Sequence, residues 1–345
     1  MQIRRVLYPF SLLYGAVTSV RNKFFDWGIL SSESFDIPII SVGNITVGGT
    51  GKTPFTEYLI RLLHKEYQLA LLSRGYKRQT KGAFLSSNKS TASDIGDEPF
   101  QIKKKFSDVE IVVAEKRLEG IDIIKNQTAT EVVLMDDAYQ HRYVKPGLSV
   151  LVIDYNRPLW NDLPFPAGNL RETKGGQKRA DIILVNKCPA TLSDEERKKW
   201  IKKLKVHTEQ KVFFSTITYG SIVDKEGQVV EIDDKTVLAL AGIAKPEPFL
   251  NYLKLRYSIS KELIYPDHHS FTTKDVEKIK EDIRKIIPDG FIVSTEKDCT
   301  RLYGLDKEID EKLVYVPIQL QILFEEEKTL ELIIRNYVRD YQKDS

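Results

Sequence analysis

The sequence predicts an α/β protein, with an open parallel sheet that has helices on both faces and a second, smaller α/β domain after it. Short β-branched segments alternate with helix-like segments from Ile37 onward, at residues 69–72, 111–113, 132–135, 149–153, 182–185 and 212–214. That alternation is typical of parallel strands joined by crossover helices. Ligands of such sheets bind at the carboxyl ends of the strands, so we expect the functional residues there.

Length and composition predict more than one domain. The chain has 345 residues, and 41% of them are hydrophobic, which is enough to build two cores. A change of pattern occurs near Gly227, which lies between short strand-like runs around Ile222 and Val229. We therefore expect an N-terminal segment over residues 1–35, a first α/β domain over 36–218, a hairpin-like linker over 219–235 and a smaller α/β domain over 236–345.

Charge and cysteine content exclude several classes of protein. The formal net charge is only +3, so the chain lacks the strongly basic balance of many nucleic-acid-binding proteins. Cys188 and Cys299 are too few and too far apart for a disulfide framework or a metal cage, which fits a reducing cytoplasmic setting. We expect no nucleic-acid partner, and no obligate protein partner is evident.

A glycine-rich stretch follows the strand-like run Ile37–Ile40 and precedes a helical pattern. It reads Thr46-Val47-Gly48-Gly49-Thr50-Gly51-Lys52-Thr53. The glycines let successive backbone N–H groups point at one anion, and the following helix adds its positive N-terminal end. Lys52 is then expected to reach the β- and γ-phosphates of a nucleotide, and Thr53 to place its hydroxyl on Mg²⁺. Thr46 replaces the usual first glycine, and an ordinary glycine turn is the alternative.

Further polar residues follow other predicted strands. Asp136 and Asp137 end an apolar run at the point where a nucleotide-bound Mg²⁺ needs oxygen ligands. Gln140 and His141 add polar groups to the same rim, although a single histidine is more often structural. Arg74 follows the second strand, so we expect it to point into the same crevice.

Three loops carry the remaining candidates. Asp97 lies in Gly-Asp-Glu-Pro before a helix, and by composition alone an N-cap is the favoured role. The proline-rich stretch 163–172 ends in Arg171 and Glu172, which suits either lipid contact or a place near phosphate and metal. His268 follows Asp267 in the smaller domain, without the ligand spacing of a zinc site.

The N-terminal segment has an uncharged run from Val6 to Val20, flanked by Arg4, Arg5, Arg21 and Lys23. About 20 apolar residues are needed to span a bilayer, so this run is too short. Basic residues beside aromatic and aliphatic ones are typical of segments that lie in the membrane interface. We expect such an interfacial segment, and the alternative is a helix packed on its own domain.

Two missing signatures narrow the choice of nucleotide and function. Membrane-associated partition-type ATPases carry a lysine before their Gly-Gly-x-Gly-Lys-Thr, where this chain has Val47. Guanine-specific proteins use Asn-Lys-x-Asp, whereas the stretch from Asn186 ends in Pro189. ATP is therefore the expected nucleotide. A regulatory ATPase at the membrane surface, without a lipid substrate, is the alternative function.

Together these motifs resemble the tetraacyldisaccharide 4'-kinases of lipid A biosynthesis, which are P-loop proteins. The resemblance extends from the N-terminal apolar segment to about the last helix. The residues that carry it are Gly43-Asn44, the stretch 48–54, Ser73-Arg74-Gly75-Tyr76, Gly96-Asp97-Glu98-Pro99, Asp136-Asp137 with Gln140-His141, Leu163-Pro164, Ala167-Gly168, Arg171-Glu172, Asp267-His268 and Thr295-Glu296-Lys297-Asp298.

The resemblance implies a peripheral enzyme on the cytoplasmic face of a bacterial inner membrane. It would transfer the γ-phosphate of ATP to the 4'-hydroxyl of a tetraacylated glucosamine disaccharide 1-phosphate, giving lipid IVA. Asp97 would be the base, in place of a mere cap, with His268 orienting it from the second domain. The remaining expected roles are Mg²⁺ binding by Thr53 with Asp136, Asp137 or Glu172, charge neutralisation by Arg171, and substrate contacts by Arg74, Arg117, Gln140 and His141.

Overall fold

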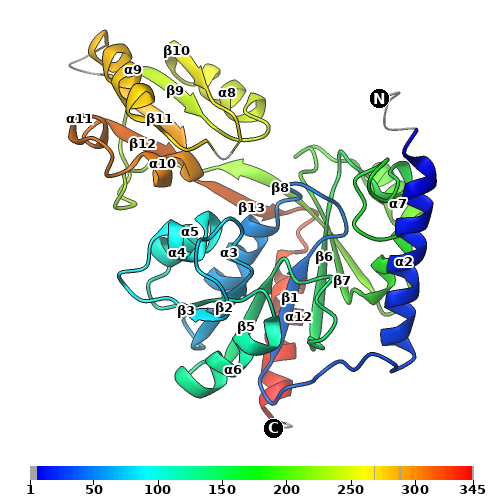
Figure 1. Ribbon diagram of the computed structural model, residues 1–345. Helices are drawn as coiled ribbons and strands as arrows, with labels where there is room; N and C mark the ends of the chain where they lie inside the picture. Colours follow the sequence, from blue (N-terminus) through cyan, green and yellow to red (C-terminus); the bar gives the residue numbers. More distant parts are fainter. Residues whose placement is uncertain (1–5, 268, 287–289, 344–345) are drawn as a thin grey trace. The chain divides into compact units, whose positions relative to one another are not determined.

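The computed structural model describes residues 6–267, 269–286 and 290–343, and the chain divides into two compact units. The larger unit comprises residues 1–217 and 320–345, and the smaller unit comprises residues 218–319. Figure 1 shows both units, coloured along the sequence.

A sheet of nine strands, counted within the described residues, forms the centre of the larger unit in the order β13-β8-β7-β6-β1-β5-β2-β4-β3. The chain enters at β1, which pairs in parallel with both β5 and β6. β2 pairs in parallel with β4, whereas the short β3 is antiparallel to β4. The predicted open parallel sheet is confirmed. Its strands are β1 Ile39–Gly43, β2 Leu69–Ser73, β3 Phe84–Leu85, β4 Glu110–Val113, β5 Val132–Asp136, β6 Leu148–Asp154, β7 Ile182–Asn186, β8 Lys211–Tyr219 and β13 Ile318–Ile322.

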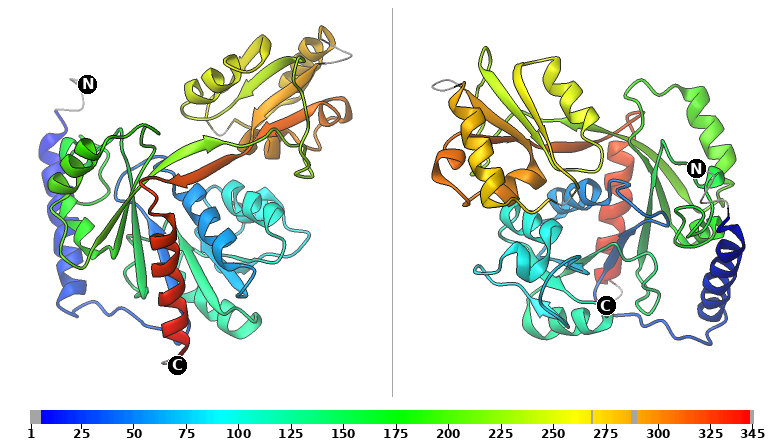
Figure 2. Two further views of the ribbon diagram at one scale, coloured as in Figure 1. Left: turned by 180° about the vertical axis from the view of Figure 1, so that it is seen from behind. Right: turned by 45° about the horizontal axis from the view of Figure 1, so that its top comes forward.

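Helices cover both faces of this sheet. Because successive side chains of a strand point to opposite faces, one strand can contribute to the hydrophobic cores on both sides. In β6, Val150 and Val152 belong to the core that contains α3 and α12, whereas Leu151 and Ile153 belong to the core that contains α7. Figure 2 shows α3 and α12 against one face of the sheet. The helices of this unit are α2 Tyr8–Asp26, α3 Lys52–Leu63, α4 Ala92–Ile95, α5 Asp97–Lys105, α6 Arg117–Gln127, α7 Asp194–Leu204 and α12 Glu327–Lys343, with short 3₁₀ turns η1 Leu159–Asn161 and η2 Lys174–Arg179.

The C-terminal helix α12 packs on the larger sheet, which corrects the predicted domain over 236–345. Leu330, Ile334 and Val338 are fully buried in the core of the larger unit. The Tyr337 hydroxyl donates to the backbone oxygen of Ile39 at 3.1 Å and accepts from its N–H at 3.0 Å. An apolar stripe predicts that a helix is buried, but it does not say against which sheet.

The smaller unit holds a parallel sheet, four strands in its described part, in the order β10-β9-β11-β12. An antiparallel bridge joins Val223 to Val229, and Gly227 takes a φ of 82° in the turn between them. Ile222 and Ile232 are buried in the core of this unit, so the hairpin is part of it and not a separate linker. The elements are β9 Thr236–Ala241, α8 Glu247–Lys254, β10 Ser258–Ile264, α9 Thr273–Arg284, β11 Phe291–Thr295, α10 Glu296–Leu302, α11 Lys307–Asp310 and β12 Leu313–Val316.

Candidate active site

The glycine-rich loop connects the central strand to a helix, as predicted. Strand β1 ends at Gly43 and α3 begins at Lys52. Gly48 and Gly51 have φ angles of 97° and 91°, in the left-handed region that glycine adopts without steric cost. The sharp bends at these positions shape a loop at the N-terminus of α3, where backbone N–H groups and the helix dipole favour an anion.

Two asparagines fix the shape of this loop. The Asn44 amide donates to the Thr50 hydroxyl at 3.0 Å from within the loop. From strand β7, the Asn186 amide donates to the Thr50 carbonyl at 3.2 Å. A Cβ atom at Gly51 would lie 2.0 Å from Asn186 Nδ2, so only glycine allows this approach. Side chains from within the loop and from β7 therefore fix its shape, which favours a binding loop over an ordinary glycine turn.

Two cations brace the outer side of the loop. Arg157 Nη1 donates to the backbone oxygen of Val47 at 3.1 Å, and Lys187 Nζ donates to that of Gly49 at 2.5 Å. Both also pair with the buried carboxylate of Asp154, at 3.5 and 3.2 Å. We did not predict these residues as part of the site. The sequence feature that could have identified Arg157 and Lys187 is their position shortly after β6 and β7, at the edge of the sheet where ligands bind.

Lys52, Asp137 and Arg171 come together beside the loop. Lys52 Nζ lies 3.2 Å from Asp137 Oδ1, and Arg171 Nη1 lies 3.0 and 3.1 Å from the two carboxylate oxygens of Asp137. Burial by itself raises the pKa of Asp137, but Lys52 and Arg171 together lower it below its usual value. The sequence placed these residues in three separate motifs, and the fold gathers them into one ionised cluster.

Asp136 has a different environment from its neighbour. Its side chain is buried, and Thr56 Oγ1 donates to Asp136 Oδ1 at 3.3 Å. Burial raises the pKa of Asp136 to about 7, and the nearby Glu98 carboxylate adds to this shift, while Lys52 and Arg117 oppose it. A further cation bound close to Asp136 would therefore lower this pKa and favour the ionised carboxylate.

Three of the predicted metal ligands, Thr53, Asp136 and Asp137, lie at the phosphate loop or at the end of β5 beside it. Their oxygens are the hard ligands that Mg²⁺ prefers, and in kinase sites phosphates and water complete its coordination. In the part of the chain that the structure describes, no three His, Cys, Asp or Glu side chains form a ready metal cluster. The residues present thus fit an ion that arrives with a nucleotide.

Glu172 is held by other groups, which does not support its predicted contact with the metal. Arg179 donates to both of its carboxylate oxygens, at 2.9 and 3.0 Å. The Asn22 amide donates to one of these oxygens at 2.9 Å, and the Gln140 amide to the other at 3.0 Å. With both oxygens engaged and the side chain buried, Glu172 fits a structural role beside the site.

Asp97 is the first residue of α5, and the N-cap position belongs to Gly96. The compositional expectation that Asp97 is the cap is therefore wrong. Gly96 has a φ of 91°, and a Cβ atom there would lie 3.0 Å from the backbone of Gly75, which follows β2. This close backbone contact brings the loop with Arg74 against the start of α5. The half-buried Asp97 thus lies in the first turn of α5, at the end of the helix that favours a negative charge.

The other predicted substrate residues divide into exposed and buried groups. Arg74 is exposed, whereas Arg117 is buried and donates to the backbone oxygen of Asp136 at 3.4 Å. Burial lowers the pKa of Arg117 to about 10. Through its hydrogen bond to Asp136, Arg117 supports the end of β5.

His141 is affected by the same arginines. Burial, with Arg117 and Arg74 nearby, lowers the pKa of His141 to about 4, so its imidazole is neutral.

Gln140 links elements around the loop. Its amide donates to the backbone oxygen of Asn44 at 2.8 Å as well as to Glu172. Its side-chain oxygen accepts from Arg171 at 3.4 Å. In this structure Gln140 joins site residues to one another. His268 lies outside the described residues, so its predicted role has no structural account.

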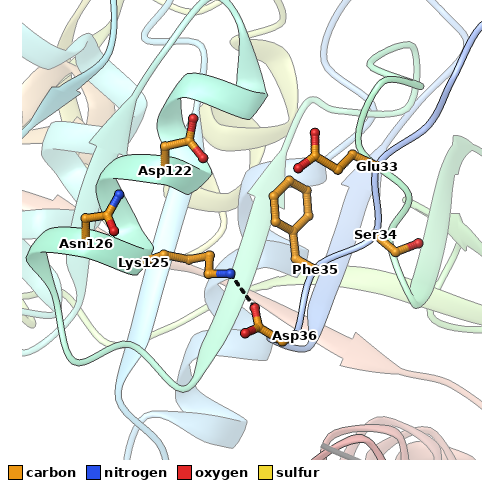
Figure 3. A pocket seen from close by; sticks show the side chains of 7 residues that line it. All are labelled: Glu33, Ser34, Phe35, Asp36, Asp122, Lys125 and Asn126. Carbon is orange, nitrogen blue, oxygen red and sulfur yellow. Dashed lines mark hydrogen bonds and ion pairs between the residues drawn. The ribbon is translucent and has the colours of Figure 1, made fainter.

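A separate pocket lies at the other end of β1, where the chain enters that strand (Figure 3). It is polar, it holds about 440 Å³, and Lys125 pairs with Asp36 across it at 2.5 Å. The amino ends of parallel strands are not where such sheets bind ligands, and no predicted site residue lines it. Its lining residues are Glu33, Ser34, Phe35, Asp36, Asp122, Lys125 and Asn126.

A family model described as tetraacyldisaccharide-1-P 4'-kinase matches residues 3–339. The chain belongs to this family. The resemblance seen in the motifs is thereby confirmed over nearly the whole length.

Similar proteins agree with the family assignment. A tetraacyldisaccharide 4'-kinase of Phocaeicola vulgatus is 42% identical, over 100% of this chain and 98% of its own length. One of Flavobacterium johnsoniae is 44% identical, over 98% of each. A crystal structure of LpxK from Aquifex aeolicus in complex with ATP is 28% identical, with a TM-score of 0.78 over 97% of this chain and 99% of that one.

Membership in this tetraacyldisaccharide 4'-kinase family determines the class of chemistry. The chain is a kinase of lipid A biosynthesis that uses ATP, on a P-loop fold. The alternative of a regulatory ATPase without a lipid substrate is not favoured.

Proposed function

We propose that this kinase transfers the γ-phosphate of ATP to the 4'-hydroxyl of a tetraacylated glucosamine disaccharide 1-phosphate, giving lipid IVA. The observation that carries the proposal is the convergence of Lys52, Asp137 and Arg171 beside a preformed phosphate loop. The relatives that bear the name tetraacyldisaccharide 4'-kinase support the identity of the acceptor.

Phosphoryl transfer needs positioning and charge neutralisation more than covalent help from the protein. The loop N–H groups and Lys52 would hold the β- and γ-phosphates, with Lys52 already oriented by Asp137 at 3.2 Å. Arg171, oriented by the same carboxylate, would stabilise the negative charge on the group in transfer. The cluster thus keeps two cations in place before the nucleotide binds.

The residues that would hold Mg²⁺ are Thr53, Asp136 and Asp137. When bound, the ion supplies positive charge to the phosphates. Asp136 and Asp137 lie at the end of β5, beside the loop that follows β1, because these two strands pair in parallel.

Asp97 would accept the proton of the sugar hydroxyl. It is a half-buried carboxylate in the first turn of α5, and a carboxylate is a usual general base for a sugar hydroxyl. The role of His268 as its supporting partner stays a prediction of the sequence.

The acceptor is a lipid, and α2 has the surface of a helix that lies on lipid. Large apolar side chains face outward along it, with Phe10 62% and Leu13 65% exposed, while Ser11 and Gly15 are buried against the protein. Phe25 is the large apolar side chain of α2 that is buried, whereas in most surface helices the apolar stripe as a whole faces the core. Figure 1 shows α2 at the outer edge of the larger unit.

The neighbouring loop extends this apolar surface. Phe165 is exposed, and its ring lies 6.0 Å from that of Tyr14 in an edge-on contact. Among the described helices, none is long and apolar enough to cross a bilayer. We propose peripheral attachment to the cytoplasmic face of the inner membrane through α2 and this loop, by burial of apolar side chains at the headgroup level.

The proposal is tested by incubating the protein with γ-labelled ATP and the tetraacyl disaccharide 1-phosphate in detergent micelles. We expect the label in a doubly phosphorylated lipid, and we expect Lys52→Ala to abolish its formation. Label released only as inorganic phosphate would contradict the assignment of the acceptor.

A further inference from the structure

We propose that Tyr14, Arg21 and Asn22 of α2 are positioning residues for phosphoryl transfer, so that this helix sets the turnover rate as well as attaching the protein to lipid. The inference rests on the proposed function. It starts from the inward face of α2, where Phe25 is buried and where Tyr14, Arg21 and Asn22 hydrogen-bond to loops beside the site.

The first contact supports Arg171. The backbone from Asn169 to Arg171 pairs with the first half of the phosphate loop, with Arg171 N–H donating to the Ile45 oxygen at 2.8 Å and Val47 N–H donating to the Asn169 oxygen at 2.7 Å. The Tyr14 hydroxyl donates to the Arg171 carbonyl at 2.9 Å. Arg171 is thus held by the phosphate loop through its N–H and by α2 through its carbonyl.

The second contact supports Glu172 and, through it, Gln140. The Asn22 amide donates to Glu172 Oε2 at 2.9 Å, and the Gln140 amide donates to Glu172 Oε1 at 3.0 Å. The same Gln140 nitrogen donates to the backbone oxygen of Asn44, directly after β1. Asn22 is therefore connected to the start of the phosphate loop through two side chains.

The third contact is made by Arg21, whose Nη2 donates to the Gln140 carbonyl at 3.0 Å. The partners of α2 in these contacts, Gln140, Arg171 and Glu172, lie in loops between β5 and β7 and not within a strand or helix. Residues on loops hold a catalytic geometry only when neighbouring groups fix them. The helix supplies this support next to the residues that pair with Asp137.

Hydrogen bonds depend steeply on distance and angle, so a shift of α2 along its axis breaks these contacts together. A misplacement of about 1 Å at a reacting group can cost about a hundredfold in rate. The outward face of α2 makes none of these contacts. Loss of the inward contacts should thus lower kcat, without changing the apolar surface available to lipid.

The experiment compares Tyr14→Phe and Asn22→Leu with Thr18→Val. Thr18 is the matched control, because its hydroxyl donates to the backbone oxygens of Tyr14 and Gly15 within α2 itself. For each variant we would measure kcat and the KM for ATP with acceptor in detergent micelles, flotation with vesicles of anionic phospholipid, and Tm.

We expect kcat to fall about tenfold in Tyr14→Phe and in Asn22→Leu, since each loses one positioning hydrogen bond near the site. The KM for ATP and vesicle flotation should stay at the wild-type values, and Thr18→Val should keep wild-type kcat. Wild-type kcat in both test variants would overturn the proposal and leave α2 as an anchor only.

Three further results each have a meaning of their own. Absence of lipid phosphorylation by the wild-type protein would contradict the proposed function itself. If Asn22→Leu does not fold, judged by its Tm, Tyr14→Phe decides the matter alone, because it removes only one hydroxyl group. Loss of vesicle flotation with unchanged kcat in micelles would also overturn the proposal.

Discussion

Each of the two sheets of this protein is followed by an aspartate, in a loop or helix directly after one of its strands. The two aspartates differ in solvent exposure and in their partners. In the larger unit, Asp137 follows β5, is 31% exposed and pairs with Lys52 and Arg171. In the smaller unit, Asp298 lies in the helix that follows β11 and has no exposed side-chain surface. It accepts from the Gly242 N–H at 2.8 Å and the Thr295 hydroxyl at 2.6 Å, and it pairs with Arg301 at 3.3 Å.

The difference lies in the partners of the two carboxylates and in their access to solvent, and it motivates our proposal that Asp137 is functional and Asp298 structural. Asp137 pairs with cationic side chains that can turn to a phosphate, and solvent reaches it. Asp298 is enclosed by backbone and side-chain donors, and it joins the ends of β9 and β11. In the motif Thr295-Glu296-Lys297-Asp298, for which the sequence predicted no role, Thr295 and Asp298 thus take part in contacts that hold two strand ends of the smaller unit together.

The largest expected effect is on catalysis, at Asp137. Asp137→Asn should lower turnover about a thousandfold, because it removes the charge that orients Lys52 and Arg171 and a proposed metal ligand. Partly exposed ion pairs contribute little to folding, so the free energy of unfolding should change by less than about 1 kcal/mol. Steady-state kinetics and urea unfolding would check both halves of the prediction.

The same substitution at Asp298 should act mainly on folding. Asp298→Asn replaces one accepting oxygen by an amide that faces donors, and it removes the charge beside Arg301, so the free energy of unfolding should fall by about 3 kcal/mol. Urea unfolding of the full chain, followed by a probe of the smaller unit, would measure this. Stability equal to that of the wild type would remove the distinction between the two aspartates.

Asp97 sharpens the comparison, since it is a half-buried carboxylate in the larger unit. Asp97→Ala should lower kcat about a hundredfold or more, the usual contribution of a general base, while ATP affinity stays unchanged. Turnover and nucleotide titration would check this. Near-normal kcat would leave Asp97 with a structural role only, like Asp298.

The smallest expected effect comes from a comparison of exposed leucines on two helices of the larger unit, α2 and α12. Leu13→Ser should weaken binding to anionic vesicles about tenfold, because an exposed apolar side chain no longer enters the lipid interface. Leu332→Ser, at an exposed leucine of α12, is the matched control and should leave binding unchanged. Equal binding of both variants and the wild type in a flotation assay would contradict the interfacial role of α2.

Sequence patterns predicted the parts of the site that depend on local chemistry. The phosphate loop, the carboxylates after β5 and the loop with Arg171 follow from residue types placed after strands, and parallel pairing brings them to one edge. The supports could not be predicted in this way. Asn186, Arg157 and Lys187 act on the loop across more than 100 residues of sequence, which no local pattern reveals.

Two other features escaped prediction for related reasons. The role of Glu172 is set by Arg179 and Asn22, and a carboxylate next to an arginine in sequence gives no sign of these partners. The apolar run in α2 predicted a membrane surface, but only the fold shows that Tyr14 and Asn22 hold site residues. Long-range hydrogen bonds decide both cases.

The most direct test of the central claim is a ³¹P NMR analysis of the lipid after reaction with ATP, alongside measurement of the ADP formed. We predict one new phosphomonoester at the 4' position for each ADP with the wild-type protein, and neither product with Lys52→Ala. Formation of ADP with inorganic phosphate and an unchanged lipid would contradict the account.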